Sequence, residues 1–301
     1  MTTLLKVNNL LTKAKKNRWH YAYLFIAPIL ILFGLFRVYP AIETLIFSFF
    51  RVEIVAHRYQ WVALKNFLAL LHDLSFAKAV SNTFIYALYI VSISTFLGLV
   101  LAAMFNSKMK LAGFFKGIYF VPFITSTVAA AVVWSYLYDP KFGLFNMLLK
   151  LAHLHPRGWI ASSQDALMCI IIFSIWKTLG YNMVIFIAGL QNIPESYYEA
   201  ALIDGAGPLT KFFKITVPLI TPTIFFVIIY NTILSLKVFD QVFVLTAGGP
   251  AEASTVVVLQ IYNQAFLNYR FGYASAMAFV LFVLIMLITI VQYLLSKKWE
   301  I

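Results

Sequence analysis

Four residues near position 177 combine polar side chains with helical spacing inside a long apolar stretch. Ser174, Lys177, Thr178 and Tyr181 follow one another at i, i+3, i+4 and i+7, so a helix would place all four on one face. A lysine in the middle of a membrane helix costs roughly 2.5–3.5 kcal/mol and often has a function. Its ammonium group needs a carboxylate, a carbonyl or water, and we expect Lys177 to face a water-filled path.

A second polar face follows about fifty residues later. Asn231 and Ser235 are four positions apart, with Lys237 and Asp240 nearer the end of the same apolar stretch. We expect the two faces to converge on a pathway. The alternative is ordinary packing, because serine, threonine and asparagine side chains commonly hydrogen-bond between membrane helices.

The segment between these two stretches predicts a short surface helix of about ten residues. Pro194 can open a helix because its missing N–H is not needed there, and Gly205 can close it in the left-handed conformation. Tyr198, Ala201 and Leu202 would share one face, and small Ala200 and Ala201 permit close contact with another protein. The acidic residues favour docking to a protein over resting on anionic lipid headgroups; they are Glu195, Glu199 and Asp204.

The composition identifies the elements that must position these residues. Of the 301 residues, 62% are hydrophobic and 11% charged, and the mean hydropathy is +0.87. A soluble protein has about a quarter charged residues. Stretches of about 20 apolar residues predict transmembrane helices, and the sequence predicts an all-α integral membrane protein. We expect six spans near residues 21–45, 80–105, 113–137, 166–190, 215–237 and 271–295.

The distribution of lysine and arginine predicts the orientation. A basic cluster that includes Lys13, Lys15 and Arg18 precedes the first span, and such charges stay in the cytoplasm. We therefore expect both termini inside (N-in/C-in). The predicted organisation is a cytoplasmic segment, a membrane domain with a cytoplasmic loop between its fourth and fifth spans, and a cytoplasmic tail; these occupy residues 1–20, 21–295 (loop about 191–214) and 296–301.

At the loop the sequence resembles a known family. Glu199-Ala200-Ala201, then Gly205, Ile215 and Pro218, match the E-A-A-x3-G-x9-I-x-L-P signature of the membrane subunits of binding-protein-dependent ABC importers; Val217 replaces the leucine. The run Leu245 to Pro250 and Asp204-Gly205-Ala206 resemble the carbohydrate branch, of maltose type or glycerol-3-phosphate type. The resemblance covers nearly the whole chain.

This resemblance implies a permease subunit that imports a sugar, an oligosaccharide or a sugar derivative by alternating access. Its implied partners are a second permease, an ATPase dimer that binds ATP and Mg, and an extracytoplasmic solute-binding protein, in the cell membrane of a bacterium or archaeon. The predicted surface helix would be the coupling helix that docks on the ATPase, through Glu199, Ala200, Ala201, Asp204 and Gly205. Tyr181, Asn231 and Ser235 would supply the aromatic plane and hydrogen-bonding groups that sugars need.

Other functions find little support in the residues. None of the thirteen glycines precedes a lysine, so the phosphate-binding G-x4-G-K-[S/T] loop is absent and we expect no cofactor site and no enzyme activity in this chain. Lone Cys169 excludes a disulfide framework, His153 and His155 are weak metal candidates, and no motif indicates nucleic acid. The remaining alternative is a secondary carrier driven by an ion gradient, for which we find no inverted repeat.

Overall fold

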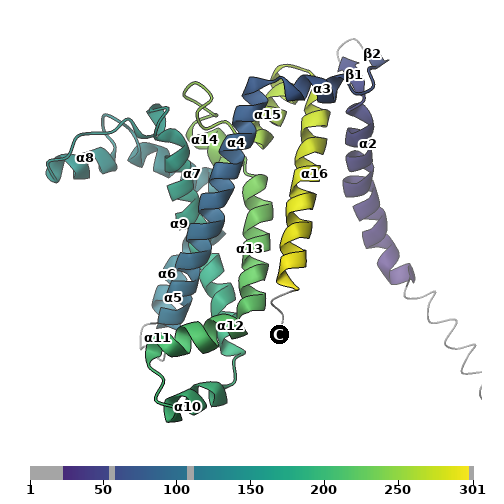
Figure 1. Ribbon diagram of the computed structural model, residues 1–301. Coiled ribbons are helices and arrows are strands. Elements are labelled where there is room, and N and C mark those ends of the chain that lie inside the picture. The colour runs from purple at the N-terminus through teal and green to yellow at the C-terminus, as the bar shows by residue number, and fades with distance from the viewer. Residues whose placement is uncertain (1–22, 54–57, 107–111, 298–301) are drawn as a thin grey trace, which may run out of the picture.

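The long helices of the chain form a bundle along one common axis, and several short helices lie across it (Figure 1). The structure is a computed structural model that describes residues 23–53, 58–106 and 112–297. The predicted cytoplasmic segment 1–20, and residues 298–301 of the predicted tail, lie outside the described residues. Four unbroken helices are long and apolar enough to cross a membrane, or up to six crossings if each of two bent helix pairs is one span. The four are Tyr23–Phe47, Leu74–Phe105, Ala166–Gln191 and Phe271–Ser296.

The first helix stands at the side of the bundle. None of its most apolar window is buried within the chain, and Phe25 and Phe36 are 81% and 70% exposed. Its last part packs against the final helix, α16, and a small antiparallel hairpin follows it. The elements in this region are η1 (Gly34–Val38), α2 (Tyr39–Phe47), β1 (Phe50–Glu53), β2 (Arg58–Trp61) and α3 (Lys65–Leu71).

The second of these four helices is continuous and has three segments, α4 (Leu74–Tyr89), η2 (Ile90–Ser94) and α5 (Thr95–Phe105). It starts at Leu74, earlier than the predicted residue 80. Asp73 fixes this start, because its carboxylate accepts a hydrogen bond of 3.0 Å from the amide of Phe76.

The predicted third span, 113–137, is wrong as a single helix. Two helices, α6 (Ala112–Ile124) and α7 (Thr127–Leu137), meet at an angle of 98°. Pro122 weakens the end of α6, since proline donates no backbone hydrogen bond. Ser126 has an extended ψ of 128°, and its hydroxyl caps the new helix at the amide of Ala129.

The predicted fifth span, 215–237, is also bent. Its first part comprises α11 (Pro208–Lys211), η4 (Phe212–Thr216) and α12 (Val217–Leu219), and α13 (Thr221–Leu236) follows at 67°. Ile220 leaves the helical region with ψ at 7°. Pro222 follows in the first turn of α13, where its lack of an N–H is tolerated.

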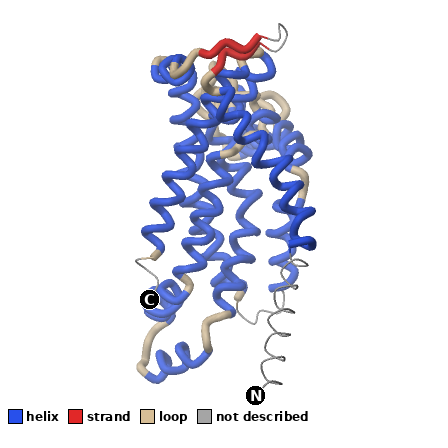
Figure 2. The backbone as a smooth tube through the Cα atoms, turned by 90° about the vertical axis from the view of Figure 1, so that its right-hand side faces the viewer, coloured by secondary structure: helices blue, strands red, loops and turns tan. Residues whose placement is uncertain are grey.

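The remaining elements lie in the bundle or at its two ends. Figures 1 and 2 place α10 at one end, and the hairpin with α3 at the other. Phe173, Val242 and Leu259 centre one buried cluster, and Met183 and Phe186 centre another. The elements are α8 (Leu144–Leu151), η3 (Trp159–Ala161), α9 (Ala166–Gln191), α10 (Glu195–Ile203), α14 (Asp240–Leu245), α15 (Val257–Tyr262), η5 (Asn263–Leu267) and α16 (Phe271–Ser296).

Candidate functional site

The predicted surface helix is present as α10. It lies beyond the end of the bundle, joined to α9 and α11 by short loops (Figure 2). The first helical residue is Glu195, and Pro194 lies one position before it with an extended ψ of 134°. Gly205 ends it with a φ of +74°, while the amides of Gly205 and Ala206 donate to the carbonyls of Leu202 and Ala201. This is the Schellman arrangement, which favours glycine at this position.

The motif residues divide between two faces of α10. Ala201 is buried at 7% exposure, so it faces this chain. The other four motif residues point to the surface, and exposed apolar Leu202 and Ile203 adjoin them; the four are Glu199, Ala200, Asp204 and Gly205. A helix that is acidic, small-residue and partly apolar on its free side can dock in a cleft of another protein.

A hydrogen bond ties α10 to η4, in the first part of the bent pair that ends with α13. The hydroxyls of Tyr198 and Thr216 lie 3.0 Å apart, beside a hollow of 310 Å³ that Lys211 and Leu190 also line. Sequence reasoning placed Tyr198 on the same face as Ala201 but missed this contact. Thr216 lies in η4, two residues before Pro218 of the motif, so the hydrogen bond joins α10 to the second half of the motif.

The lysine in the apolar stretch finds its partners at the bend between α6 and α7. Its ammonium group donates to the carbonyl oxygens of Pro122 and Thr125, at 3.0 and 2.7 Å. A helix leaves its last carbonyls without intrahelical partners, so Lys177 meets acceptors that the bend provides. The sequence predicted a carboxylate, a carbonyl or water, and the structure places carbonyls there.

A glycine allows α6 and α9 to approach this closely. A Cβ atom at Gly180 would lie only 1.8 Å from the carbonyl oxygen of Tyr119. Any other residue would therefore push the two helices apart and move Lys177 away from the bend.

Aromatic rings from three helices gather one turn further along. Tyr181 of α9 stacks on Phe123 of α6 with centroids 4.6 Å apart, and lies 4.9 Å from Tyr230 of α13. All three rings are partly exposed. Phe123 and Tyr230 were not predicted, because only the folded arrangement brings them to Tyr181, although Tyr230 is next to predicted Asn231.

The other predicted path residues are buried or partly buried, and the side chains of three of them donate hydrogen bonds within the chain. Ser174 is 2% exposed and its hydroxyl donates to the carbonyl of Ile170, and partly buried Thr178 donates to the carbonyl of Ser174. Asn231, also 2% exposed, donates to Thr95 at 3.3 Å, and Ser235 is 4% exposed. The structure thus brings Lys177 and Tyr181 to a partly open face and places Ser174, Asn231 and Ser235 in the interior.

An apolar groove lies beside the contact between Lys177 and Thr125. It has a volume of 540 Å³ and lies between α7 and α9, where Thr125, Trp134 and Trp176 line it. Within the described ranges, no three histidine, cysteine, aspartate or glutamate side chains gather as a metal site would need. The arrangement supplies hydrogen-bonding and aromatic groups on one open side of the bundle, together with an exposed docking helix.

Comparisons with known proteins agree with this architecture. The model of the family "Binding-protein-dependent transport system inner membrane component" matches residues 94–301. The chain has the same fold as a chain of a bacterial alginate ABC transporter, solved with an alginate pentasaccharide-bound periplasmic protein. That match has a TM-score of 0.85 at 23% identity and covers 95% of this chain and 96% of the other.

Relatives of higher identity are similar over nearly their whole length. The trehalose/maltose transport system permease protein MalF of Thermococcus litoralis is 35% identical, covering 94% of this chain and 96% of that protein. The sn-glycerol-3-phosphate transport system permease protein UgpA of Salmonella typhimurium is 32% identical, covering 92% and 94%. By its matching model and by these relatives, the chain belongs to the family of binding-protein-dependent transport system inner membrane components, the non-catalytic permease subunits of ABC importers.

Proposed function

We propose that this chain forms half of the membrane path of an ATP-driven importer for a sugar or sugar derivative. The observation that carries the proposal is α10, a capped helix that holds the E-A-A-x3-G motif clear of the bundle. In this proposal α10 is the coupling helix, and it docks on a separate ATPase dimer that binds ATP and Mg. Closure of the ATPase moves α10, and the Tyr198–Thr216 contact passes the movement to the fifth crossing.

The proposed topology counts each bent helix pair as one span, which gives six spans with both termini in the cytoplasm of a bacterium or archaeon. Lys211, Lys214 and Lys297 lie at the α10 end of the bundle, as the positive-inside rule requires. A solute-binding protein would then dock at the opposite end, where the hairpin and α3 lie.

A second permease subunit would complete the path. The first helix buries none of its apolar window within this chain, and the groove beside Lys177 is open. A partner subunit would cover both surfaces and leave the substrate path between the two permeases.

The substrate class follows from the groups on the open face. The neighbouring rings of Tyr181 and Tyr230, which are tilted by 32°, offer planes for the C–H faces of a sugar ring, and Lys177 offers a cation. The relatives and the solved neighbour carry names that include trehalose, maltose, glycerol-3-phosphate and alginate. We infer a neutral or anionic sugar derivative for this chain.

The test is uptake by proteoliposomes that contain the chain with the ATPase and second permease that co-purify with it. Labelled sugars should enter only with internal ATP and added binding protein. Glu199→Lys, on the exposed face of α10, should abolish uptake and ATPase co-purification, whereas Gln191→Lys, which also places an exposed lysine at this end of the bundle, should leave both intact. Uptake by the chain alone, driven by an ion gradient, would identify a secondary carrier instead.

The path residues have a separate test in the same liposomes. Lys177→Leu should reduce uptake while ATPase co-purification stays normal, and Lys297→Leu, at the exposed C-terminal end of α16, is the control. Unchanged uptake by Lys177→Leu would exclude this lysine from the path.

A further inference from the structure

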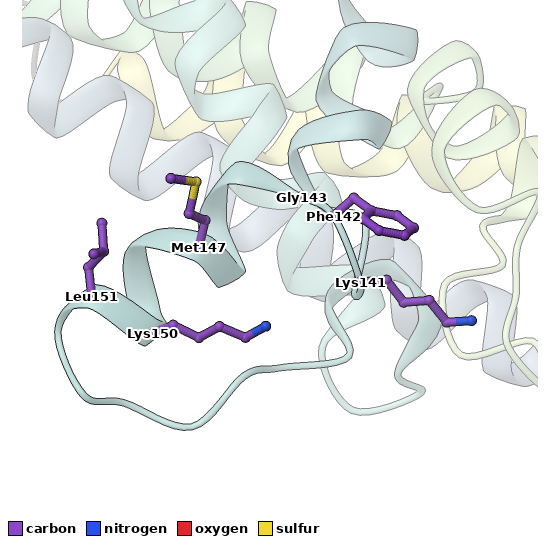
Figure 3. A pocket seen from close by; sticks show the side chains of 6 residues that line it. All are labelled: Lys141, Phe142, Gly143, Met147, Lys150 and Leu151. Atoms are coloured by element: carbon purple, nitrogen blue, oxygen red, sulfur yellow. The ribbon is translucent and has the colours of Figure 1, made fainter.

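Helix α8 turns its apolar face away from its own chain. Leu144, Met147, Leu148 and Leu151 follow i, i+3, i+4, i+7 spacing and are 46%, 59%, 52% and 68% exposed. Figure 3 shows Met147 and Leu151 on one side of the helix, with Lys150 projecting in another direction. In a water-facing helix the apolar residues would cover the core, so this orientation indicates an apolar surrounding.

The opposite face of α8 holds the polar anchor. Asn146 is 1% exposed, and its amide group donates to the carbonyls of Pro140 and Arg157 at 2.8 Å each. Its side-chain oxygen accepts from the amide of Arg157 and from the indole of Trp159. These four hydrogen bonds fix which face of α8 points outward, so the exposure of the leucines is a property of the fold.

Aromatic rings from α7, α8 and η3 gather around buried Tyr138, where α8 meets the bundle. Tyr138, Phe145 and Trp159 form mutual ring contacts at 5.1–5.7 Å, and Trp134 joins them at 5.5 Å from Tyr138. Tryptophan and tyrosine gather where spans leave the hydrocarbon, and here α7 ends and α9 begins. Figure 1 shows α8 lying across the direction of the spans and extending away from the bundle.

Basic groups border the apolar face. Lys141 and Lys150 are exposed and line a hollow of 370 Å³ with Phe142, Met147 and Leu151 (Figure 3). Phe142 is 91% exposed and extends the apolar surface. An ammonium group beside an apolar wall fits a phospholipid, whose phosphate pairs with the lysine while its chains cover the leucines.

We propose that α8 lies in the membrane interface at the end of the bundle opposite α10, with its leucines among the lipid chains and Lys141 and Lys150 bound to the phosphates of anionic phospholipids. The exposed acidic face of α10 lacks this complementarity to lipid. The proposal concerns the attachment of the subunit to its membrane, and it holds whatever solute the subunit transports.

The experiment uses the full chain in nanodiscs of phosphatidylethanolamine and phosphatidylglycerol. A Leu148→Cys variant carries an environment-sensitive fluorophore, and some lipids carry a nitroxide on the acyl chain. Native Cys169 is 1% exposed, so the parent chain reports background labelling. We expect strong nitroxide quenching at position 148 and little at His155→Cys, an exposed control site on the same arm. Thermal unfolding in detergent confirms that both variants fold.

The charges are tested in the same system. Lys141→Gln and Lys150→Gln should each lower, by about fivefold, the ratio of chains whose label at position 148 lies in the membrane to chains whose label lies in water. In nanodiscs of phosphatidylcholine alone, the variants and the parent chain should give the same ratio. A label at position 148 that stays in water would overturn the proposal. The proposal would also be overturned if the label at position 148 left water only when a second permease subunit was present, because α8 would then be a protein-docking element.

Discussion

Helices α8 and α10 are both short and both leave the bundle, at opposite ends, but they are attached in different ways. Asn146 fixes α8 through four hydrogen bonds, and a cluster of aromatic rings supports its base. The contact between Tyr198 and Thr216 ties α10 to the rest of the chain, and a glycine with positive φ ends it. The exposed face is apolar and bordered by lysines in α8, and acidic with small residues in α10.

The difference matches the two surroundings that we propose. An arm in a lipid interface needs a fixed orientation, because its apolar face must meet the hydrocarbon. A helix that moves together with an ATPase needs a turn at each end that lets it change direction. It also needs direct contact with the span that it moves. The following changes test each side of this comparison.

The largest effect is expected from Asn146→Ala, which removes all four hydrogen bonds of the α8 anchor. At about 1 kcal/mol each, local stability should fall by about 3–4 kcal/mol. Trypsin should then cut faster after Lys150 and Arg157 in detergent, while ATPase co-purification through α10 stays normal. Asn268→Ala, at an exposed asparagine, is the control. An unchanged cleavage rate would mean that the rings alone hold the arm.

Gly205→Val should strain the end of α10 by about 1–2 kcal/mol, since a branched side chain disfavours the left-handed conformation. We expect ATP-dependent uptake to fall more than tenfold. Gly207→Val is a matched control, because a Cβ meets nothing within 4 Å at either position and only Gly205 has a positive φ. Equal losses of uptake in both variants would contradict a role for the left-handed turn at Gly205.

Tyr198→Phe should have a smaller effect, because it removes one hydroxyl worth about 0.5–1.5 kcal/mol. Solute transported per ATP hydrolysed should fall severalfold while the ATPase still binds. Tyr197, which is 51% exposed, provides the control variant Tyr197→Phe. If transport per ATP is unchanged, the movement of α10 reaches the fifth crossing by another contact.

The smallest effect concerns the turn that leads into α8. The amides of Phe142 and Lys141 both donate to the carboxylate of Asp139 and hold its pKa below the ordinary value. The turn is therefore stabilised at neutral pH, and this contribution is lost as the pH falls below about 4. Pepsin cleavage at Phe142 should be slower in the parent chain than in Asp139→Asn at the upper end of the acid range, and the two rates, compared at the same pH, should converge as the pH falls. A rate ratio that does not change with pH would contradict a contribution of the Asp139 carboxylate.

The sequence predicted helices best where one local signal dominated. Apolar length located the four unbroken crossings, and Pro194 and Gly205 bounded α10 to within one residue. Pro122 and Pro222 lie beside the two bends, but the count of apolar residues takes no account of proline. Hydropathy measures how long an apolar stretch is, and it does not register a change of direction.

The candidate path was predicted less completely, because its geometry depends on contacts between distant segments. Spacing grouped Lys177 with Tyr181 on α9, but the Pro122 and Thr125 carbonyls come from a bend 52 residues or more away in the chain. The polar spacing of Asn231 and Ser235 is equally consistent with an interior position. A buried, satisfied asparagine and a path-lining one have the same pattern in the sequence.

The contact between Lys177 and the bend has an evolutionary consequence. An ammonium group inside an apolar stretch and a broken helix are each costly in a membrane. Here the partly exposed Lys177 donates to carbonyls that the bend leaves without helix partners. A substitution that removes only the lysine or only the helix break should therefore destabilise the protein more than the removal of both. Among relatives, we expect the lysine, the proline and the close-approach glycine to be gained and lost together, so that intermediate combinations are rare.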